Sequence, residues 1–329
     1  MNVLSLFDGM SCGQLALQKA GIPITNYFAS EIDKHAVKFT AAKYPNMVHL
    51  GSVTDVAASA LPKIDILIGG SPCQGFSFAG KGLNFKDPRS ALFFEYVRIL
   101  DEIRERNPDV LFHLENVRMK KEHEDVISRI LDLQPININS SLLSAQNRER
   151  LYWTNIGIAQ RGLFDDNYCT IPQPKDKGIY LKDIIVSDVE EKHFLSEKAS
   201  KYVTNKIRLS KMFTAINGNK SMTVCAKYDS SKNGTFICVD SNGRMDEYKT
   251  GTIGARYYKG VEQFGSNPFL LADKRIRRFT PIEVCRLQTV PDDYFFIDGK
   301  QAVSDTQIYK MCGNGWTVDV IAHILSFMK

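Results

Sequence analysis

The chain reads Ile64-Asp65-Ile66-Leu67-Ile68-Gly69-Gly70-Ser71-Pro72-Cys73 where an apolar run gives way to two glycines and a cysteine. A short apolar run bounded by glycine predicts a buried strand, here over residues 64–68. Cys73 would then lie at the carboxyl edge of a sheet, where α/β proteins hold their ligands. A thiol in that place is a candidate nucleophile, but free cysteines are often buried and inert. This stretch alone leaves both interpretations open.

Strands and helices alternate on both sides of this stretch. We expect further strands over 3–6, 24–29 and 110–114, and helices over 14–20, 34–43 and 92–103. The alternation predicts an α/β fold with a doubly wound, mostly parallel, Rossmann-like sheet whose ligand lies across the carboxyl ends of the strands. Residues 318–328 return to a helical apolar pattern, and we expect them to pack on the same domain.

Residues 183–275 differ in character from the rest of the chain. Short polar and β-branched pieces are separated by turns such as Asn217-Gly218-Asn219 and Asn242-Gly243. This pattern predicts a smaller strand-and-loop domain. We therefore expect a larger domain over 1–184 and 286–329, and a smaller domain with a hinge over 185–285.

The basic charge is concentrated in the same region. Residues 190–279 hold 17 of the 42 Lys and Arg residues but only 9 of the 37 Asp and Glu residues. Such a segment would attract a polyanion such as nucleic acid, because neutralised phosphates release counterions. Charge alone is equally typical of an ordinary lysine-rich surface.

Composition excludes several classes of protein. The 329 residues, 43% of them hydrophobic, can bury a sizeable core. No apolar run approaches the roughly 20 residues of a membrane span, and the N-terminus has no signal-peptide pattern. Seven cysteines without a C-x-x-C pair argue against a disulfide framework and a zinc site. We therefore expect a soluble cytoplasmic protein with no metal and no membrane contact.

A glycine-rich turn follows the first expected strand. Small residues at Gly9, Ser11 and Gly13 would let backbone amides approach a ligand. Glu31 ends the second strand, where a carboxylate can bind the ribose hydroxyls of a nucleotide. The turn lacks G-x-G-x-x-G, the pattern of nicotinamide dehydrogenases. The turn and Glu31 together therefore favour a different adenosine cofactor.

The order of these and later motifs resembles the cytosine-5 DNA methyltransferase family, and runs from the first strand to the last helix. The motifs are Phe7-Asp8-Gly9, Glu31, Gly70-Ser71-Pro72-Cys73-Gln74, Glu115-Asn116-Val117, Gln146-Asn147-Arg148-Glu149-Arg150 and Gly313-Asn314. Details such as Gly315-Trp316-Thr317-Val318 look similar to the animal de novo branch and to its bacterial or phage relatives. The resemblance implies a class I methyltransferase fold and S-adenosylmethionine as the methyl donor.

The resemblance also implies the chemistry. Cys73 would attack C6 of the target cytosine, so that C5 becomes nucleophilic enough to accept a methyl group. Glu115 would share a proton at N3 and accept a hydrogen bond from the exocyclic amine. Arg148 resembles the ligand of the cytosine carbonyl oxygen and Arg150 a supporting residue, whereas two surface arginines in salt bridges are the alternative.

Further positions carry over from the family as cofactor contacts. They are Phe7, Gly9, Ser11, Gly13, Glu31, Ile32, Ser52, Val53, Pro72, Asn314 and Trp316. Ser52 stands where relatives have an acidic residue that contacts the adenine amine. Asp55 is a substitute for that acid or, as we expect, a cap of the following helix.

Double-stranded DNA is the implied partner. A cytosine must leave the duplex to be attacked, and we expect residues 74–90 to form a loop that closes over the flipped base. The candidate DNA contacts are Gln74, Ser77, Thr223, Arg256, Tyr258 and Lys259, and the basic segment would hold the target-recognition region. We expect a monomer; a cognate restriction endonuclease fits the resemblance and would not be a stable partner. A tRNA cytosine-5 methyltransferase and an inactive nucleic-acid-binding relative remain alternatives.

Overall fold

A seven-stranded sheet forms the centre of the larger region. The computed structural model describes residues 1–72, 91–160, 167–205, 214–216, 219–226, 228, 234–239 and 275–328. The strand order is β3-β2-β1-β4-β5-β7-β6. The strands are β1 (Asn2–Leu6), β2 (Asn26–Ser30), β3 (Val48–Gly51), β4 (Ile66–Gly70), β5 (Leu111–Val117), β6 (Ile136–Asn139) and β7 (Glu149–Thr154). The pairs among β1 to β5 are parallel and β7 is antiparallel to both its neighbours, so the predicted doubly wound, mostly parallel sheet is confirmed.

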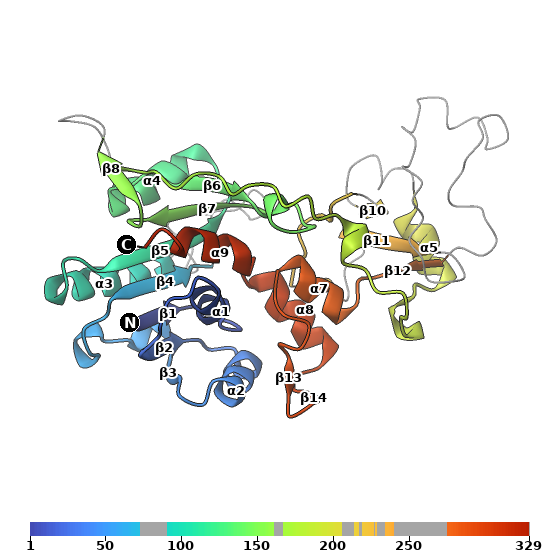
Figure 1. Cartoon of the computed structure of the whole chain (residues 1–329), viewed down its shortest axis with the longest axis horizontal. Coiled ribbons are helices and arrows are strands. Elements are labelled where there is room, and N and C mark those ends of the chain that lie inside the picture. The colour runs from blue at the N-terminus through green and yellow to red at the C-terminus, as the bar shows by residue number, and fades with distance from the viewer. Residues whose placement is uncertain are drawn as a thin grey trace.

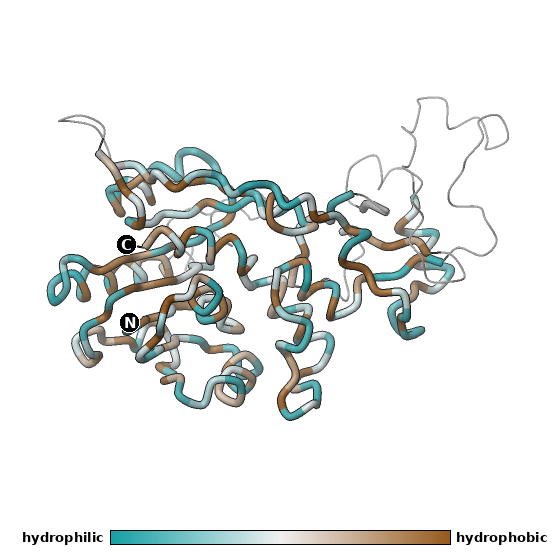
Figure 2. Tube along the Cα trace, in the orientation of Figure 1, coloured by the Kyte–Doolittle hydropathy of each residue, from teal (hydrophilic) through white to brown (hydrophobic). Residues whose placement is uncertain are grey.

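Helices cover both faces of this sheet (Figure 1). The helices α1 (Cys12–Lys19), α2 (Lys34–Lys43) and α9 (Val318–Leu325) pack in one apolar cluster with Ile66 and Ile68. On the other face, α3 (Ala91–Arg106) and α4 (Lys121–Leu131) pack with Leu67. Side chains alternate across a strand, which is why one apolar run supplies both cores. Hydrophobic stretches of the chain accordingly coincide with the strands of the sheet (Figure 2).

The two glycines of β4 lie inside the strand and not after it, which differs from the expected end at residue 68. Gly69 and Gly70 pair in parallel with Leu114 and Glu115 of β5. A Cβ at Gly69 would lie 3.0 Å from the Tyr96 ring and 3.2 Å from the Leu6 carbonyl oxygen. Glycine therefore continues the strand because the neighbouring atoms leave no room for a side chain.

A smaller sheet lies at the other end of the molecule from the seven-stranded sheet (Figure 1). It consists of β10 (Thr214–Ile216), β11 (Gly234–Val239) and β12 (Arg275–Arg277), beside α5 (Glu197–Val203). The remaining strands and helices are β8 (Ile158–Gln160), β9 (Asn167–Cys169), α7 (Pro281–Leu287), β13 (Phe296–Ile297), β14 (Lys300–Gln301) and α8 (Asp305–Asn314). The expected domain limit at residue 285 falls within α7, whose buried residues Val284, Cys285 and Leu287 belong to the larger core.

A buried ion pair joins the end of the smaller sheet to α7. Both guanidinium Nη atoms of Arg277 donate to the carboxylate of Glu283 at 2.8 Å, and both side chains are almost fully buried. The same carboxylate accepts from the backbone N–H of Val186 and of Thr280. With its charge and lone pairs satisfied, this pair fixes where β12 enters α7. No helix within the described ranges has the length and apolar character needed to cross a membrane.

Candidate active site

The turn between β1 and α1 has an unusual backbone. Phe7, Gly9 and Ser11 all have a left-handed conformation, with φ near +60°. The Gly9 N–H donates to Glu31 Oε2 at 2.8 Å, so the turn is tied to the end of β2. A Cβ at Gly13 would lie 2.3 Å from Ile68 Cδ1, which shows how closely α1 packs on β4. The expected cofactor turn and the expected ribose carboxylate are thus neighbours.

Asp8 lies beneath this turn and was not assigned a role from the sequence. Its carboxylate accepts hydrogen bonds from Tyr27 Oη at 2.8 Å and from Ser11 Oγ. Removal from water raises the pKa of the Asp8 carboxyl to about 6, although these hydrogen bonds oppose the rise. The carboxylate therefore holds the turn in place from below.

Glu31 and Ile32 present two different surfaces at the end of β2. Glu31 Oε1 accepts from the backbone N–H groups of Ile32 at 2.7 Å and of Asp33 at 2.8 Å. The carboxylate is held rigidly by these bonds and keeps lone pairs for hydroxyl donors. The Ile32 side chain is 78% exposed, which leaves an apolar surface beside the carboxylate. Such a pair suits a ribose hydroxyl and the face of a purine base.

The segment after β3 differs from expectation in one respect. Ser52, not Asp55, caps the short helix η1 (Val53–Asp55), since Ser52 Oγ accepts from the Thr54 N–H. The next short helix has no side-chain cap, and the exposed Asp55 accepts from Thr54 Oγ1 at 3.1 Å. The predicted capping role of Asp55 is therefore wrong. Val53, an expected cofactor contact, is buried.

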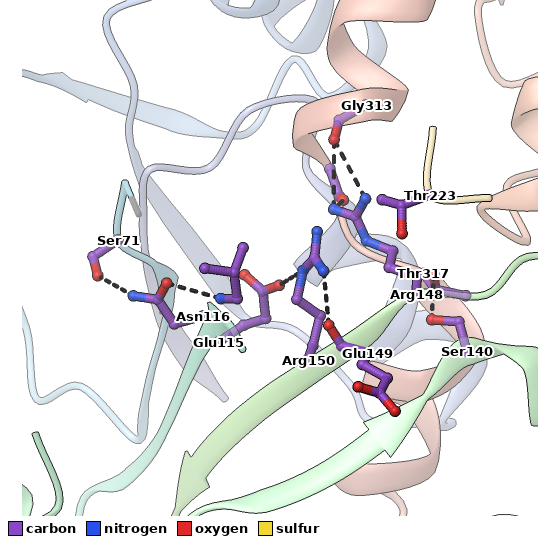
Figure 3. Close-up of polar contacts among 12 residues, drawn as sticks. Ser71, Glu115, Asn116, Ser140, Arg148, Glu149, Arg150, Thr223, Gly313 and Thr317 are labelled. Atoms are coloured by element: carbon purple, nitrogen blue, oxygen red, sulfur yellow. Dashed lines mark hydrogen bonds and ion pairs between the residues drawn. The ribbon is translucent and has the colours of Figure 1, made fainter. Parts of the chain in front are cut away.

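Glu115 lies at the carboxyl edge of β5 and faces Arg150. The carboxylate Oε1 is 2.9 Å from Arg150 Nε, and Glu115 is only 9% exposed. Strand register explains the contact, because Glu115 pairs with Tyr152 and Val117 pairs with Arg150 in the antiparallel β5–β7 pair. Arg150 and Glu115 are thus diagonal neighbours on one face of the sheet. Figure 3 shows the two side chains pointing toward each other.

The other face of the same edge ties β5 to the end of β4. Asn116 Nδ2 donates to Ser71 Oγ at 3.2 Å, and both side chains are buried. Asn116 Oδ1 accepts from the Val117 N–H at 2.8 Å (Figure 3). This bond fixes the chain immediately before Pro72, an expected cofactor contact. Cys73 follows directly but lies outside the described residues.

Other predicted site residues also lie outside the part of the chain that the structure describes. These are the expected loop 74–90 with Gln74 and Ser77, and the expected DNA contacts Arg256, Tyr258 and Lys259. Their roles stay predictions.

Arg148 is held in a different way from the one expected. Its guanidinium donates to main-chain carbonyl oxygens of Gly315 at 2.9 Å, Val224 at 3.4 Å and Gly313 at 3.5 Å. The side chain is 3% exposed, and burial together with the nearby Arg150 charge lowers its pKa to about 10, so it stays charged at neutral pH. Arg150, and not Arg148, is the arginine beside Glu115.

Trp316 brings the C-terminal motif to the same edge. A Cβ at Gly70 would lie 2.9 Å from Trp316 Nε1 and 3.0 Å from Glu115 Oε2. The indole, the carboxylate and the glycine of β4 therefore meet at one point. Asn314, an expected cofactor contact, is exposed at the end of α8.

His113 is a site neighbour that sequence reasoning missed. Its ring contacts Trp316 edge-on, with 5.8 Å between ring centroids, and stacks on Tyr152. Burial lowers its pKa to about 3, so the imidazole is neutral. The signal was a histidine in an apolar strand, two residues before Glu115 and therefore on the same face.

Thr223 is exposed and lies beside the segment that leads into β7. Its Oγ1 donates to the Asn147 carbonyl at 2.7 Å, and the Asn147 N–H donates to the Ser221 carbonyl at 2.8 Å. The expected phosphate contact is thus held against the motif at 146–150. Within the described ranges, no group of three His, Cys, Asp or Glu side chains could hold a metal ion.

Comparisons with known proteins agree with this geometry. A family model described as C-5 cytosine-specific DNA methylase matches residues 1–329. The type II methyltransferase M1.ScrFI of Lactococcus lactis subsp. cremoris is 32% identical over 99% of this chain and 77% of that protein. The type II methyltransferase M.NlaX of Neisseria lactamica is 31% identical over 99% of this chain and 96% of that protein.

Solved structures of the same shape include two from eukaryotes. The methyltransferase EhMeth of Entamoeba histolytica superposes with a TM-score of 0.72 at 17% identity, over 99% of this chain and 97% of that one. The DNMT2 of Spodoptera frugiperda superposes with a TM-score of 0.66 at 23% identity, over 99% and 98%. At these identities the likeness describes the fold alone, and it is that of a class I methyltransferase.

Proposed function

Since this chain belongs to the family of C-5 cytosine-specific DNA methylases and is a DNA cytosine-5 methyltransferase, we propose that the carboxyl edge of β4, β5 and β7 carries out the methylation. One observation carries the assignment. Glu115, which faces Arg150 of β7, lies on β5 beside the end of β4, where Ser71 and Pro72 immediately precede Cys73. A carboxylate, a guanidinium and a thiol can therefore converge on one planar base.

Cys73 is the proposed nucleophile. Its thiolate forms a bond to C6 of the flipped cytosine, and the electron pair of the C5–C6 double bond moves toward C5 and the ring nitrogen N3. C5 then accepts the methyl group and gives its proton to a water molecule, and the electrons of that C–H bond restore the double bond as the thiolate leaves. Asn116 fixes Ser71, so the chain leaves β4 toward the nucleophile from a defined position.

Glu115 and Arg150 are proposed to hold the charge that develops on the ring. The Glu115 carboxyl group shares a proton with N3 and accepts from the exocyclic amine. Arg150 forms an ion pair with Glu115, with 2.9 Å between Nε and Oε1, and donates through Nη1 to the Glu149 carbonyl at 2.7 Å. These contacts hold the planar guanidinium beside the proposed position of the base. We assign the contact to the cytosine carbonyl oxygen to Arg150 and a positioning role to Arg148, because the guanidinium of Arg148 already donates to main-chain carbonyls.

S-adenosylmethionine is the proposed methyl donor, and the residues after β1 and β2 fit it. The rigid Glu31 carboxylate would bind the ribose hydroxyls, and the exposed Ile32 would cover the adenine face. The left-handed backbone at Phe7 and Gly9 shapes the turn so that the Gly9 N–H donates to Glu31, which keeps the turn and the carboxylate together. Bound there, the donor supplies an electrophilic methyl group to C5. The other proposed contacts are Ser11, Gly13, Ser52, Val53, Pro72, Asn314 and Trp316.

The basic region around the smaller sheet is proposed to hold duplex DNA. Thr223 would contact a phosphate, with Gln74, Ser77, Arg256, Tyr258 and Lys259 as further contacts. We propose a target-recognition domain that begins at residue 185 and ends at the start of α7, Pro281, in place of the expected limit at residue 285. A monomer, a cytoplasmic location and a restriction endonuclease as a separate counterpart are retained as proposals.

Bisulfite sequencing of DNA from a bacterial host that expresses the protein tests this function. We expect protected cytosines within one short recurring sequence, and none in a host expressing Cys73→Ala. Protected cytosines with Cys73→Ala, or none with the wild type, would contradict the proposal. Methyl incorporation into the host's tRNA alone would favour the tRNA alternative.

A further inference from the structure

Arg148 connects two segments that are far apart in the sequence. The first is the Thr223 segment, residues 221–226, and the second is the Gly313 turn, residues 313–316. One guanidinium nitrogen of Arg148 reaches carbonyl oxygens of both, at 3.4 Å for Val224 and 3.5 Å for Gly313, and the other donates to Gly315 at 2.9 Å. Figure 3 shows the Arg148 guanidinium directed at Gly313, with Thr223 beside it.

The two segments also touch each other directly at Gly313. A Cβ built there would lie 2.4 Å from the Ala226 nitrogen and 2.4 Å from the Cys225 carbonyl carbon. These are main-chain atoms, which cannot move aside as a flexible side chain could. The junction therefore exists only because residue 313 has no side chain.

Hydrogen bonds join the Thr223 segment to residues 145–147, which lead directly to Arg148. The Ser221 N–H donates to the Ala145 carbonyl at 2.7 Å, and Thr223 Oγ1 donates to the Asn147 carbonyl at 2.7 Å. Lys220 adds an ammonium group that donates to the carbonyls of Ser141 and Ser144. A phosphate bound at the Thr223 segment would therefore order the main chain that immediately precedes Arg148.

The Gly313 turn reaches the proposed donor site on its other side. Cys12 Sγ, in the first turn of α1, lies 3.7 Å from the Trp316 carbonyl oxygen. A Cβ at Gly315 would be 3.1 Å from the same sulfur. Cys12 directly follows Ser11 of the cofactor turn, so a ligand that orders this turn also orders the carbonyls that receive Arg148.

We propose that Arg148 is a positioning residue that couples DNA binding at the Thr223 segment to S-adenosylmethionine binding at the cofactor turn. The inference rests on the proposed function of this site. DNA would stabilise the Thr223 segment, and S-adenosylmethionine would stabilise the Gly313 turn. Because Arg148 joins the two segments, ordering one favours the bound arrangement of the other, so each ligand raises the affinity for the other. The coupling is reciprocal by linkage, and couplings of this kind typically amount to about 5- to 150-fold.

The test measures the Kd of S-adenosylhomocysteine by calorimetry, with and without a duplex that carries the site found by bisulfite sequencing. In the wild type, we expect the duplex to tighten binding by roughly tenfold. Arg148→Lys keeps the positive charge but cannot span both segments, so the tightening should fall below about twofold. Arg106→Lys is the matched control, because Arg106 also donates to several main-chain carbonyls, those of Ala58, Ser59 and Leu61, away from the junction.

Gly313→Ala is a second, independent way to disrupt the junction, because its methyl group would push the two segments apart without altering any charge. It should abolish the tightening as Arg148→Lys does, with each ligand still bound when added alone. Wild-type protein whose affinity does not change with DNA, or both variants retaining the full tightening, would overturn the inference. Wild-type protein that binds neither S-adenosylhomocysteine nor DNA would instead overturn the proposed function.

Discussion

The turn after β1 and the end of β5 lie at the same edge of the sheet but are fixed by different forces. The β1 turn depends on left-handed backbone and on a carboxylate, Asp8, whose pKa burial raises to about 6. The β5 end depends on Glu115 facing Arg150, with the charged Arg148 held by main-chain carbonyls nearby. The Asp8 carboxyl group changes its charge near pH 6, whereas the two arginines stay protonated. We therefore expect the donor side to respond to pH and the cytosine side to respond to substitution.

The largest effect is expected at Glu115. Glu115→Gln keeps the size of the side chain but removes the carboxyl group proposed to share a proton with N3, so turnover should fall by roughly 10²- to 10⁴-fold. Single-turnover methyl transfer to duplex DNA measures this. Glu149→Gln is the control, because Glu149 lies on the neighbouring strand in an exposed pair with Arg118. A near-normal rate for Glu115→Gln would remove this residue from the chemistry.

Arg150 should give the next largest effect. Arg150→Met leaves the Glu115 carboxylate without its cation and removes a donor from the proposed carbonyl contact, so kcat should fall roughly 10²-fold. The same single-turnover assay, together with S-adenosylhomocysteine affinity, separates loss of chemistry from loss of donor binding. Unchanged kcat with weakened donor binding would mean that Arg150 serves the donor side and that the two halves of the site are not distinct.

The smallest effect concerns pH and the β1 turn. Asp8 binds its proton more tightly in the folded state, with a pKa of about 6 against 3.8, than in the unfolded chain. The stabilisation that protonated Asp8 provides is therefore lost as the pH rises from about 3.8 to about 6. Above that range its contribution to the free energy of unfolding stays constant. Relative to Asp8→Asn, the wild-type free energy of unfolding should decrease by about 1–3 kcal/mol between about pH 4 and pH 7.

Urea unfolding of both proteins at several pH values measures that difference, and all other titrating groups are common to the two chains. Parallel pH profiles would show that Asp8 does not titrate in this range. The contrast between the two sides of the site would then rest on geometry alone.

Much of the fold follows from patterns that are local in the chain. The helix predicted at 34–43 is α2 with the same bounds, and Asp33 caps it by accepting from two backbone N–H groups. The doubly wound sheet follows from apolar runs that alternate with helical ones. Glycine was misleading at the end of β4, because a strand continues through glycines when neighbouring atoms exclude a side chain.

The site was harder to derive because its contacts depend on register. Spacing in the motif at 146–150 places two arginines on one face, but only the β5–β7 pairing decides which of them meets Glu115. The capping residue after β3 depends likewise on which backbone N–H each oxygen reaches, and Ser52 takes that place. His113 carries no motif; its place two residues before Glu115 puts it on the same face of β5, and only the structure shows its packing against Trp316.

The central claim is that Cys73 attacks C6 of a cytosine, and a duplex with 5-fluorocytosine at the target position tests it most directly. Fluorine replaces the proton that must leave C5, so the C6–sulfur bond cannot be released after methylation. With S-adenosylmethionine present, we predict a covalent protein–DNA adduct for the wild type and for Cys225→Ala, which removes an exposed thiol. We predict none for Cys73→Ala. An adduct with Cys73→Ala, or its absence in the wild type, would contradict the account.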